Sequence, residues 1–227
     1  MSLLLSLETS TSVCSVALHA NGSLLAQIEL HEDQAHSRKL SGMIKHVLEV
    51  ADKKIEDLDA VAVSSGPGSY TGLRIGISTA KGLCYASNIP LVAVNTLDII
   101  AGEVNRNNPG RALCCPMIDA RRMEVYCAIL DSDNQYRTSI EAKVIDAFSF
   151  QDVLENSTIL FCGNGALKCR GTITHPNAVF VDMVYPNAVT LGMLAYKKFQ
   201  QNNFEDLISF EPLYLKEFLV KKSLKAQ

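Results

Sequence analysis

SGPGSYTGLRIG, residues 65–76, connects an apolar strand to a glycine-containing helix. The run at 60–63 before it is typical of a buried strand, the Gly-Pro-Gly turn ends this strand, and Ser69 can cap the helix that follows. Free N–H groups at a helix start can bind phosphate or carboxylate groups. However, Pro67 has no N–H, and Leu73 stands where the Walker sequence requires lysine. The segment therefore predicts a strand, a turn and a helix. Its glycines either allow an anion to bind at the turn or are needed only for the turn's geometry and packing.

The composition of the chain is that of a globular protein. Of its 227 residues, 48% are hydrophobic and 20% are charged, which is enough to bury a core. A formal net charge of -3 argues against autonomous high-affinity binding of nucleic acid. The first residues lack the basic segment of a secretory signal and reach Glu8 early, and no apolar run approaches a membrane span. We therefore expect a cytoplasmic protein with no membrane partner.

The seven cysteines form no CxxC pair and lie mostly in apolar runs. This is typical of small buried residues in a reducing compartment, so neither metal binding nor redox chemistry is expected of them.

The same order of elements is expected twice along the chain. In the first half we expect strands at 3–7, 14–19, 24–30, 60–64 and 91–94, and helices at 35–50, 70–86 and 96–104. In the second half we expect strands at 112–118, 123–130, 136–145, 158–162 and 179–181, and helices at 147–154, 165–169 and 187–201. Between them, NRNNPGR at 105–111 has the composition of a connection.

This repetition predicts an α/β fold of two lobes, each with a mixed sheet flanked by helices. We divide the chain into an N-terminal lobe, 1–106, and a C-terminal lobe, 107–227. A cleft between two such lobes is a natural ligand site.

The order of elements resembles the duplicated ribonuclease-H-like fold of actin, Hsp70 and the sugar kinases. Four segments then narrow the resemblance to the TsaB family, also called YeaZ, and it covers essentially the whole chain. The segments are LSLETSTSVCSVAL at 5–18, SGPGSYTGLRIG at 65–76, DARRMEVYCA at 119–128 and PLYLK at 212–216.

The resemblance implies a non-catalytic scaffold subunit needed to form threonylcarbamoyladenosine beside the tRNA anticodon. Such a subunit binds and activates the catalytic paralogue TsaD, works together with the ATPase TsaE, and meets tRNA through the complex. When alone it forms a homodimer. The label glycoprotease, which such chains have carried, implies no proteolysis.

The residues themselves give no sign of a catalytic metal or nucleophile. His31 and His36 are five positions apart, so on a helix they would diverge by about 140° and cannot hold one metal ion. The serines around residue 65 do not form the GxSxG pattern of a nucleophile elbow. We expect no catalytic and no metal-binding residue. The rival hypothesis is a stand-alone actin-fold ATPase or phosphotransferase, with a peptidase as a weaker third.

Candidate nucleotide or anion contacts lie in three turns. The first follows the first strand, where the actin-like fold holds the phosphates and magnesium of ATP, and where members commonly have Asp at the position of Glu8. The second is the glycine-rich turn described above, and the third is GNGALK at 163–168. The candidates are Glu8, Thr9, Ser10, Gly68, Ser69, Gly163 and Gly165. We expect no cofactor that this chain requires, and weak nucleotide binding as a secondary property.

The helix after residue 70 carries a strip of small residues. A glycine inside a helix costs about 1 kcal/mol relative to alanine, so Gly72, Gly76 and Gly82 together indicate a close approach of another backbone. That neighbour is either the helix at 35–50 of the same chain or a helix of another subunit, and the family resemblance favours the second. TsaB-like proteins use these helices for both the homodimer and TsaD, so the two associations should compete. The partner-binding candidates are His36, Leu40, Ile44, Gly72, Arg74, Ile75, Gly76, Thr79 and Leu83.

Each of two charged segments allows two interpretations. Asp119, Arg121, Arg122 and Glu124 form either a solvated strand edge or an interface with a partner or nucleotide. Lys216 stands where relatives often have Arg, and the lysine-rich end that follows is either a tRNA contact or a soluble tail.

Overall fold

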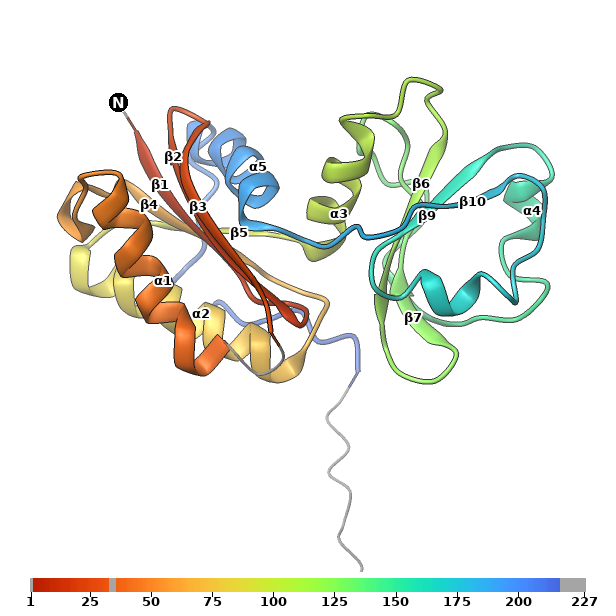
Figure 1. Cartoon of the computed structure of the whole chain (residues 1–227), viewed down its shortest axis with the longest axis horizontal. Coiled ribbons are helices and arrows are strands. Elements are labelled where there is room, and N and C mark those ends of the chain that lie inside the picture. Colours follow the sequence, from red (N-terminus) through yellow and green to blue (C-terminus); the bar gives the residue numbers. More distant parts are fainter. Residues whose placement is uncertain (1, 33–35, 217–227) are drawn as a thin grey trace, which may run out of the picture.

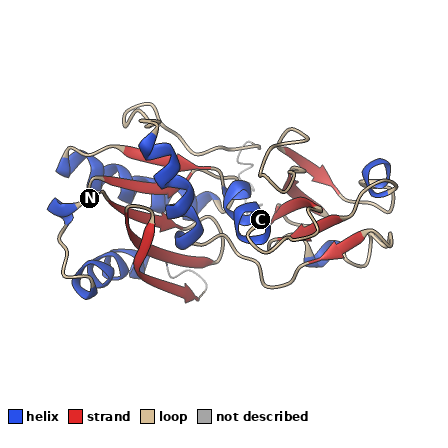
Figure 2. Cartoon of the chain, turned by 90° about the horizontal axis from the view of Figure 1, so that it is seen from above, coloured by secondary structure: helices blue, strands red, loops and turns tan. Residues whose placement is uncertain are grey.

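A five-stranded mixed sheet forms the centre of each lobe in the computed structural model, which describes residues 2–32 and 36–216 (Figures 1 and 2). The first sheet has the order β3-β2-β1-β4-β5, and the second has the equivalent order β8-β7-β6-β9-β10. In both, three antiparallel strands are followed by two strands that run parallel to the first. The predicted duplication of a mixed sheet is confirmed.

The strands of the first sheet are β1 (Leu3–Glu8), β2 (Val13–Ala20), β3 (Ser23–His31), β4 (Ala60–Ser64) and β5 (Leu91–Val94). Those of the second are β6 (Leu113–Asp119), β7 (Glu124–Cys127), β8 (Glu141–Val144), β9 (Ile159–Cys162) and β10 (Ala178–Phe180). Every residue of β1, β2 and β4 is buried, because helices cover both faces of the sheet. This explains why their sequences are continuous apolar runs without alternation.

The helices are α1 (His36–Val50), α2 (Tyr70–Ser87), α3 (Thr96–Asn105), α4 (Gln151–Leu154) and α5 (Ala188–Gln200). Two short 3₁₀ helices, η1 (Ile55–Asp57) and η2 (Leu167–Cys169), complete the set among the described residues. Helices α1 and α2 cover one face of the first sheet and α5 covers the other (Figure 1). The predicted cap is present, since the Ser69 side chain accepts a hydrogen bond from the backbone N–H of Gly72.

The predicted boundary between the lobes at residues 106 and 107 needs correction. Helix α3 precedes that boundary, yet Leu97, Ile100 and Ala101 pack into a core with residues of β6 and β9. Helix α5 follows it, yet Leu191 and Ala195 pack on β1, β4 and β5 of the first sheet. Each lobe therefore takes a helix from the other half of the sequence, because apolar faces pack where a complementary surface is available.

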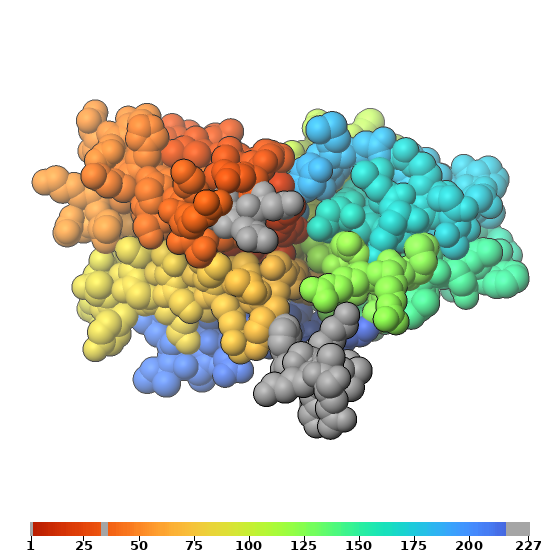
Figure 3. All heavy atoms as spheres, turned by 60° about the horizontal axis from the view of Figure 1, so that its bottom comes forward, coloured from red at the N-terminus to blue at the C-terminus, as the bar shows by residue number. Residues whose placement is uncertain are grey.

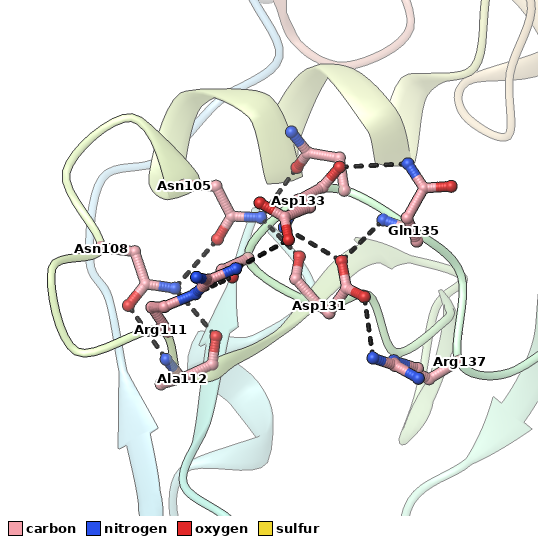
Figure 4. A network of polar contacts seen from close by, with 10 residues as sticks. Asn105, Asn108, Arg111, Ala112, Asp131, Asp133, Gln135 and Arg137 are labelled. Atoms are coloured by element: carbon pink, nitrogen blue, oxygen red, sulfur yellow. Dashed lines mark hydrogen bonds and ion pairs between the residues drawn. The ribbon is translucent and has the colours of Figure 1, made fainter.

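The segment 105–111, which the sequence marks as a connection, is held tightly to the second lobe (Figure 4). Asn105 Nδ2 donates to the carbonyl of Asp131 at 2.9 Å, and Asn108 Nδ2 donates to the carbonyl of Ala112 at 2.8 Å. The Asp131 carboxylate accepts the backbone N–H groups of Gln135 and Asp133 and pairs with Arg137 at 3.0 Å. These bonds lower the pKa of Asp131, the Gln135 N–H contributing most. The connection is thus an ordered loop held by hydrogen bonds and an ion pair.

Four predicted elements are much shorter than expected, and one of them is the helix at 147–154, which contracts to α4. The strand at 136–145 contracts to β8, because residues before it leave the ladder: the Thr138 hydroxyl instead accepts a hydrogen bond from the Ile129 backbone N–H at 2.9 Å. The strand at 123–130 contracts to β7, and Leu130 keeps only isolated bridges to Cys114 and Tyr136. The helix at 165–169 is only the 3₁₀ turn η2.

All seven cysteines are buried and free, as the sequence predicts. Among the helices in the described part of the chain, none has the length and apolar character needed to cross a bilayer.

Candidate functional site

A cleft of about 1030 Å³ lies between the two lobes. The first lobe contributes the turn after β1, the first residues of α1 and the glycine-rich turn with the start of α2. The second lobe contributes the end of β6 with the turn that follows it, and the C-terminal segment adds 213–216. Figure 3 shows the side of the molecule on which the lobes meet.

Hydroxyl groups dominate the first-lobe wall of the cleft. It includes Ser10, Thr11, Ser37 and Ser69, and His36 at the start of α1 joins them. The two turns that supply this wall pack on each other: the Ser69 backbone N–H donates to the carbonyl of Ser10 at 2.6 Å. A Cβ on Gly68 would come 2.4 Å from the same carbonyl oxygen, so glycine is required there for packing. Of the candidate anion contacts, Ser10, Gly68 and Ser69 do lie at the cleft.

Glu8 and Thr9, the other two candidate contacts of the turn after β1, are buried and do not line the cleft. The Glu8 side chain is completely buried, and its Oε1 accepts the backbone N–H of Ser10 at 2.6 Å. Burial raises the pKa of Glu8, against the opposing effect of hydrogen bonds from Ser10 and Ser64. The Thr9 hydroxyl donates to the carbonyl of Gly72 at 2.8 Å. Glu8 therefore fixes the β1–β2 turn itself, and Thr9 holds this turn against α2.

Gly163 and Gly165 also have a packing role. Gly163 has a φ of +94°, and a Cβ there would come 2.4 Å from the carbonyl oxygen of Met117. A Cβ on Gly165 would come 2.8 Å from the carbonyl carbon of Ile118. Asn164 between them lines the cleft, and its Oδ1 accepts the backbone N–H of Asp119 at 3.1 Å. Asn164 was not among the residues predicted from the sequence, although it is the one residue with a side chain between two glycines that packing requires.

The charged segment of the second lobe forms a series of connected ion pairs at the cleft. Lys168 pairs with Asp119 and donates to the carbonyl of Glu124 at 2.7 Å. The Glu124 carboxylate pairs in turn with Lys216. Arg121 and Arg122 are exposed in the turn between β6 and β7, where both have positive φ values of 71° and 51°. Asp119, Arg121 and Lys216 line the cleft, so this is more than a solvated strand edge.

A second concave surface, the α1–α2 groove, has a volume of about 310 Å³. Its apolar part is formed by Ile44, Leu48, Ile55 and Leu83. The remaining lining residues are mainly polar or charged: Ser41, Lys45, Glu49, Lys53, Lys54 and Thr79. Of the partner-binding candidates, Ile44, Thr79 and Leu83 lie here.

The other partner-binding candidates occupy different places. His36 and Leu40 are buried at 7% and 2% exposure, and Gly72 and Gly76 are buried against Thr9, so of the predicted strip of small residues only Thr79 and Leu83 are partly exposed. The close approach that the glycines indicate does exist at Gly72 and Gly76, but it is made by the backbone and side chain of Thr9 in the β1–β2 turn of the same chain. At Gly82 the prediction is wrong, since a Cβ there would meet nothing within 4 Å. Arg74 is exposed near the start of α2, and Ile75 is half-buried at the cleft.

The histidines of the sequence segment HEDQAH are separated in the structure. His31 is exposed and pairs with Glu29 at 2.7 Å, whereas His36 is buried at the cleft. Within residues 2–32 and 36–216, no three His, Cys, Asp or Glu side chains gather in a way that could hold a metal ion.

The fold and the interlobe cleft define a two-lobed α/β protein of the actin type, with a duplicated ribonuclease-H-like architecture. At the level of fold alone, component A of (R)-2-hydroxyglutaryl-CoA dehydratase from Acidaminococcus fermentans matches with a TM-score of 0.51 and 11% identity, over 87% of this chain and 99% of that one.

Similar sequences, a family model and a solved structure show to which family within this class the chain belongs. The family model of TsaD, tRNA N6-adenosine threonylcarbamoyltransferase, matches residues 23–226. The tRNA threonylcarbamoyladenosine biosynthesis protein TsaB of Haemophilus influenzae is 28% identical over 97% of this chain and 96% of its own length. The Escherichia coli protein of that name is 37% identical over 57% of this chain and 55% of its own. The structure of YeaZ from Pseudomonas aeruginosa matches with a TM-score of 0.83 and 28% identity, over 95% of this chain and all of that one. The chain belongs to the TsaB (YeaZ) family.

Proposed function

We propose that this chain is an accessory subunit in the synthesis of tRNA threonylcarbamoyladenosine, and that its α1–α2 groove docks a catalytic paralogue of the TsaD type. One relative that matches over nearly its full length is named for this pathway, and the TsaD family model itself matches the chain. In this proposal the chain supplies a docking surface, the paralogue supplies the chemistry, and a TsaE-type ATPase and tRNA join the complex in the cytoplasm.

The observation that carries the proposal is the α1–α2 groove. Ile44 and Leu83 offer an apolar floor, and Lys53 and Lys54 stand at its rim beside η1. Lys45 is paired with Glu49 at 3.6 Å on an exposed surface, a contact worth little in water. A partner with an apolar ridge flanked by carboxylates would match this surface. Since a second copy of the chain would occupy the same groove, the homodimer should compete with the paralogue.

The non-catalytic role is supported by the position of Glu8. Its carboxylate is buried, does not line the cleft and accepts the Ser10 N–H, and Asp119 on the opposite wall is paired with Lys168. Phosphoryl transfer needs a free carboxylate or metal ligand close to the phosphates. We therefore retain the cleft as a site for weak nucleotide or anion binding and do not favour a stand-alone ATPase.

The test is binding of the purified chain to its TsaD-type paralogue. Leu83→Glu places a charge on the groove floor, and Lys53→Glu reverses a charge at the rim. We expect Leu83→Glu to weaken the heterodimer at least about tenfold, since a desolvated charge at an interface core costs more than 1.4 kcal/mol. The matched control is Leu25→Glu on β3, a leucine that is 47% exposed on another face. Equal affinities of Leu83→Glu and wild-type chains would contradict the groove assignment.

A further inference from the structure

The last described residues, 210–216, cross from the first lobe to the second; we call them the strap. At its start, Lys81 of α2 donates to the carbonyl of Phe210 at 2.9 Å. In its middle, the Leu213 backbone N–H donates to the carbonyl of Ser65 at 2.7 Å. At its end, Lys216 pairs with Glu124 on β7 of the second lobe. One segment is thus bonded to both lobes, and Figure 3 shows the C-terminal segment (blue) beside α2 (yellow).

The strap separates two cavities. On one side lies the interlobe cleft, and on the other lies a cavity of about 580 Å³ that includes Asn95, Asp98 and Lys198 in its lining. Leu213 and Tyr214 line both. Displacement of the strap would therefore join the two cavities and break an ion pair that links the lobes.

The strap is fastened to α2 by a cluster of three side chains. The rings of Tyr70 and Tyr214 are 4.9 Å apart, and the guanidinium of Arg74 lies 4.1 Å from the centre of the Tyr70 ring. Arg74 Nε donates to the Tyr214 hydroxyl oxygen at 3.1 Å. Arg74 is exposed, and here its partners are an aromatic face and a neutral oxygen. A carboxylate is a stronger partner for guanidinium than a phenol oxygen, because it accepts two charge-assisted hydrogen bonds.

We propose that the strap is a latch controlled by Arg74: a carboxylate of a partner docked on α2 draws Arg74 away from Tyr214, and the strap then leaves the cleft wall. The idea rests on the docking proposed above. Arg74 belongs to the same helix as the groove residues Thr79 and Leu83, but it lies on a different side of that helix and nearer its N-terminus, so the docked partner must extend over the first turns of α2 to reach it. Docking on the outside of α2 would in this way open the cleft between the lobes. A partner carboxylate can compete for Arg74 because exposed contacts of this kind are weak in water.

The first experiment uses the free chain. Tyr214→Phe removes the oxygen that accepts from Arg74 and keeps the ring against Tyr70. We expect hydrogen exchange of the Leu213 amide to become about two- to fivefold faster, because this amide is bonded only while the strap is in place. The matched control is Tyr196→Phe, whose hydroxyl accepts from Gln200 on α5. Unchanged exchange at Leu213 in Tyr214→Phe would overturn the latch.

The second experiment adds the TsaD-type paralogue to the wild-type chain. We expect amides of α2 to gain protection while the Leu213 amide loses it. Protection of the strap that rises or stays constant on docking would overturn partner-controlled opening. Complete absence of binding would contradict the proposed function, while the Tyr214→Phe result still decides whether Arg74 and Tyr214 fasten the strap.

Discussion

Thr9 and Gly72 are bonded across the junction of the β1–β2 turn and α2: the Thr9 hydroxyl donates to the Gly72 carbonyl at 2.8 Å. A Cβ on Gly72 would come 2.1 Å from the carbonyl oxygen of Thr9. The glycine of α2 is therefore required by the chain's own backbone, and the docking surface begins elsewhere on the helix.

Gly72→Ala should destabilise the protein by about 2 kcal/mol or more, because neither backbone can move aside in the buried turn. The free energy of unfolding in urea measures this. The matched control is Gly82→Ala on the same helix, where a Cβ would meet nothing within 4 Å. That variant should be neutral or stabilising by up to about 1 kcal/mol. Equal stabilities of the two variants would refute the packing role of Gly72.

Glu8→Gln should stabilise the protein at pH 7. Burial raises the pKa of Glu8 in the folded state above the ordinary value of 4.5, so the unfolded chain ionises first as the pH rises. Stability is then lost as the pH rises from about 4.5 to the folded pKa, at up to about 1.4 kcal/mol per pH unit. Glutamine keeps an oxygen for the Ser10 N–H and removes this loss. Urea unfolding at pH 4 and pH 7 provides the check, and a variant less stable than wild type at pH 7 would contradict the prediction that the buried charge costs stability.

His19 should make the protein less stable in mild acid. It is fully buried on β2 against Gly192 of α5, where a Cβ would come 2.2 Å from its Cε1, and burial lowers its pKa below 6.5. As the pH falls through about 6.5 the unfolded chain binds a proton first, so stability falls until the folded pKa is reached. The stability of His19→Gln should change less between pH 7.5 and pH 5.5 than that of the wild type. Parallel pH profiles for the two proteins would contradict this.

The cysteines should react with a thiol reagent only when the chain unfolds. Burial raises the pKa of Cys14 and Cys84 to about 11, so at pH 8 roughly one thiol in a thousand is ionised, and all seven side chains are buried. The reaction rate at increasing urea concentration should follow the unfolded fraction. A burst of one or more thiols in native buffer would reveal an accessible cysteine.

The sequence pattern predicted the duplicated sheets well, because each strand of the first sheet is a local run and the Asn21-Gly22 turn has a short-range signal. It also predicted the Ser69 cap from local chemistry. The exchange of α3 and α5 between the lobes was not predictable. The sequence of an amphipathic helix shows that the helix has an apolar face, but it does not show which sheet that face packs on.

The candidate site was predicted in part, for a related reason. Gly72 and Gly76 indicate a close contact without indicating its direction, so the β1–β2 turn was overlooked as the neighbour. Glu8 is a charged residue in a polar turn, and nothing local predicts that its carboxylate is buried. The contact between Arg74 and Tyr214 joins residues 140 positions apart and could come only from the structure.

The most direct test of the central claim is reconstituted tRNA threonylcarbamoylation with the TsaD-type paralogue and the TsaE-type ATPase. The account predicts that modification depends on this chain, that Leu83→Glu reduces it at least about tenfold, and that Leu25→Glu supports it like the wild type. Full modification without the chain, or with Leu83→Glu, would contradict the claim that the α1–α2 groove docks the catalytic subunit.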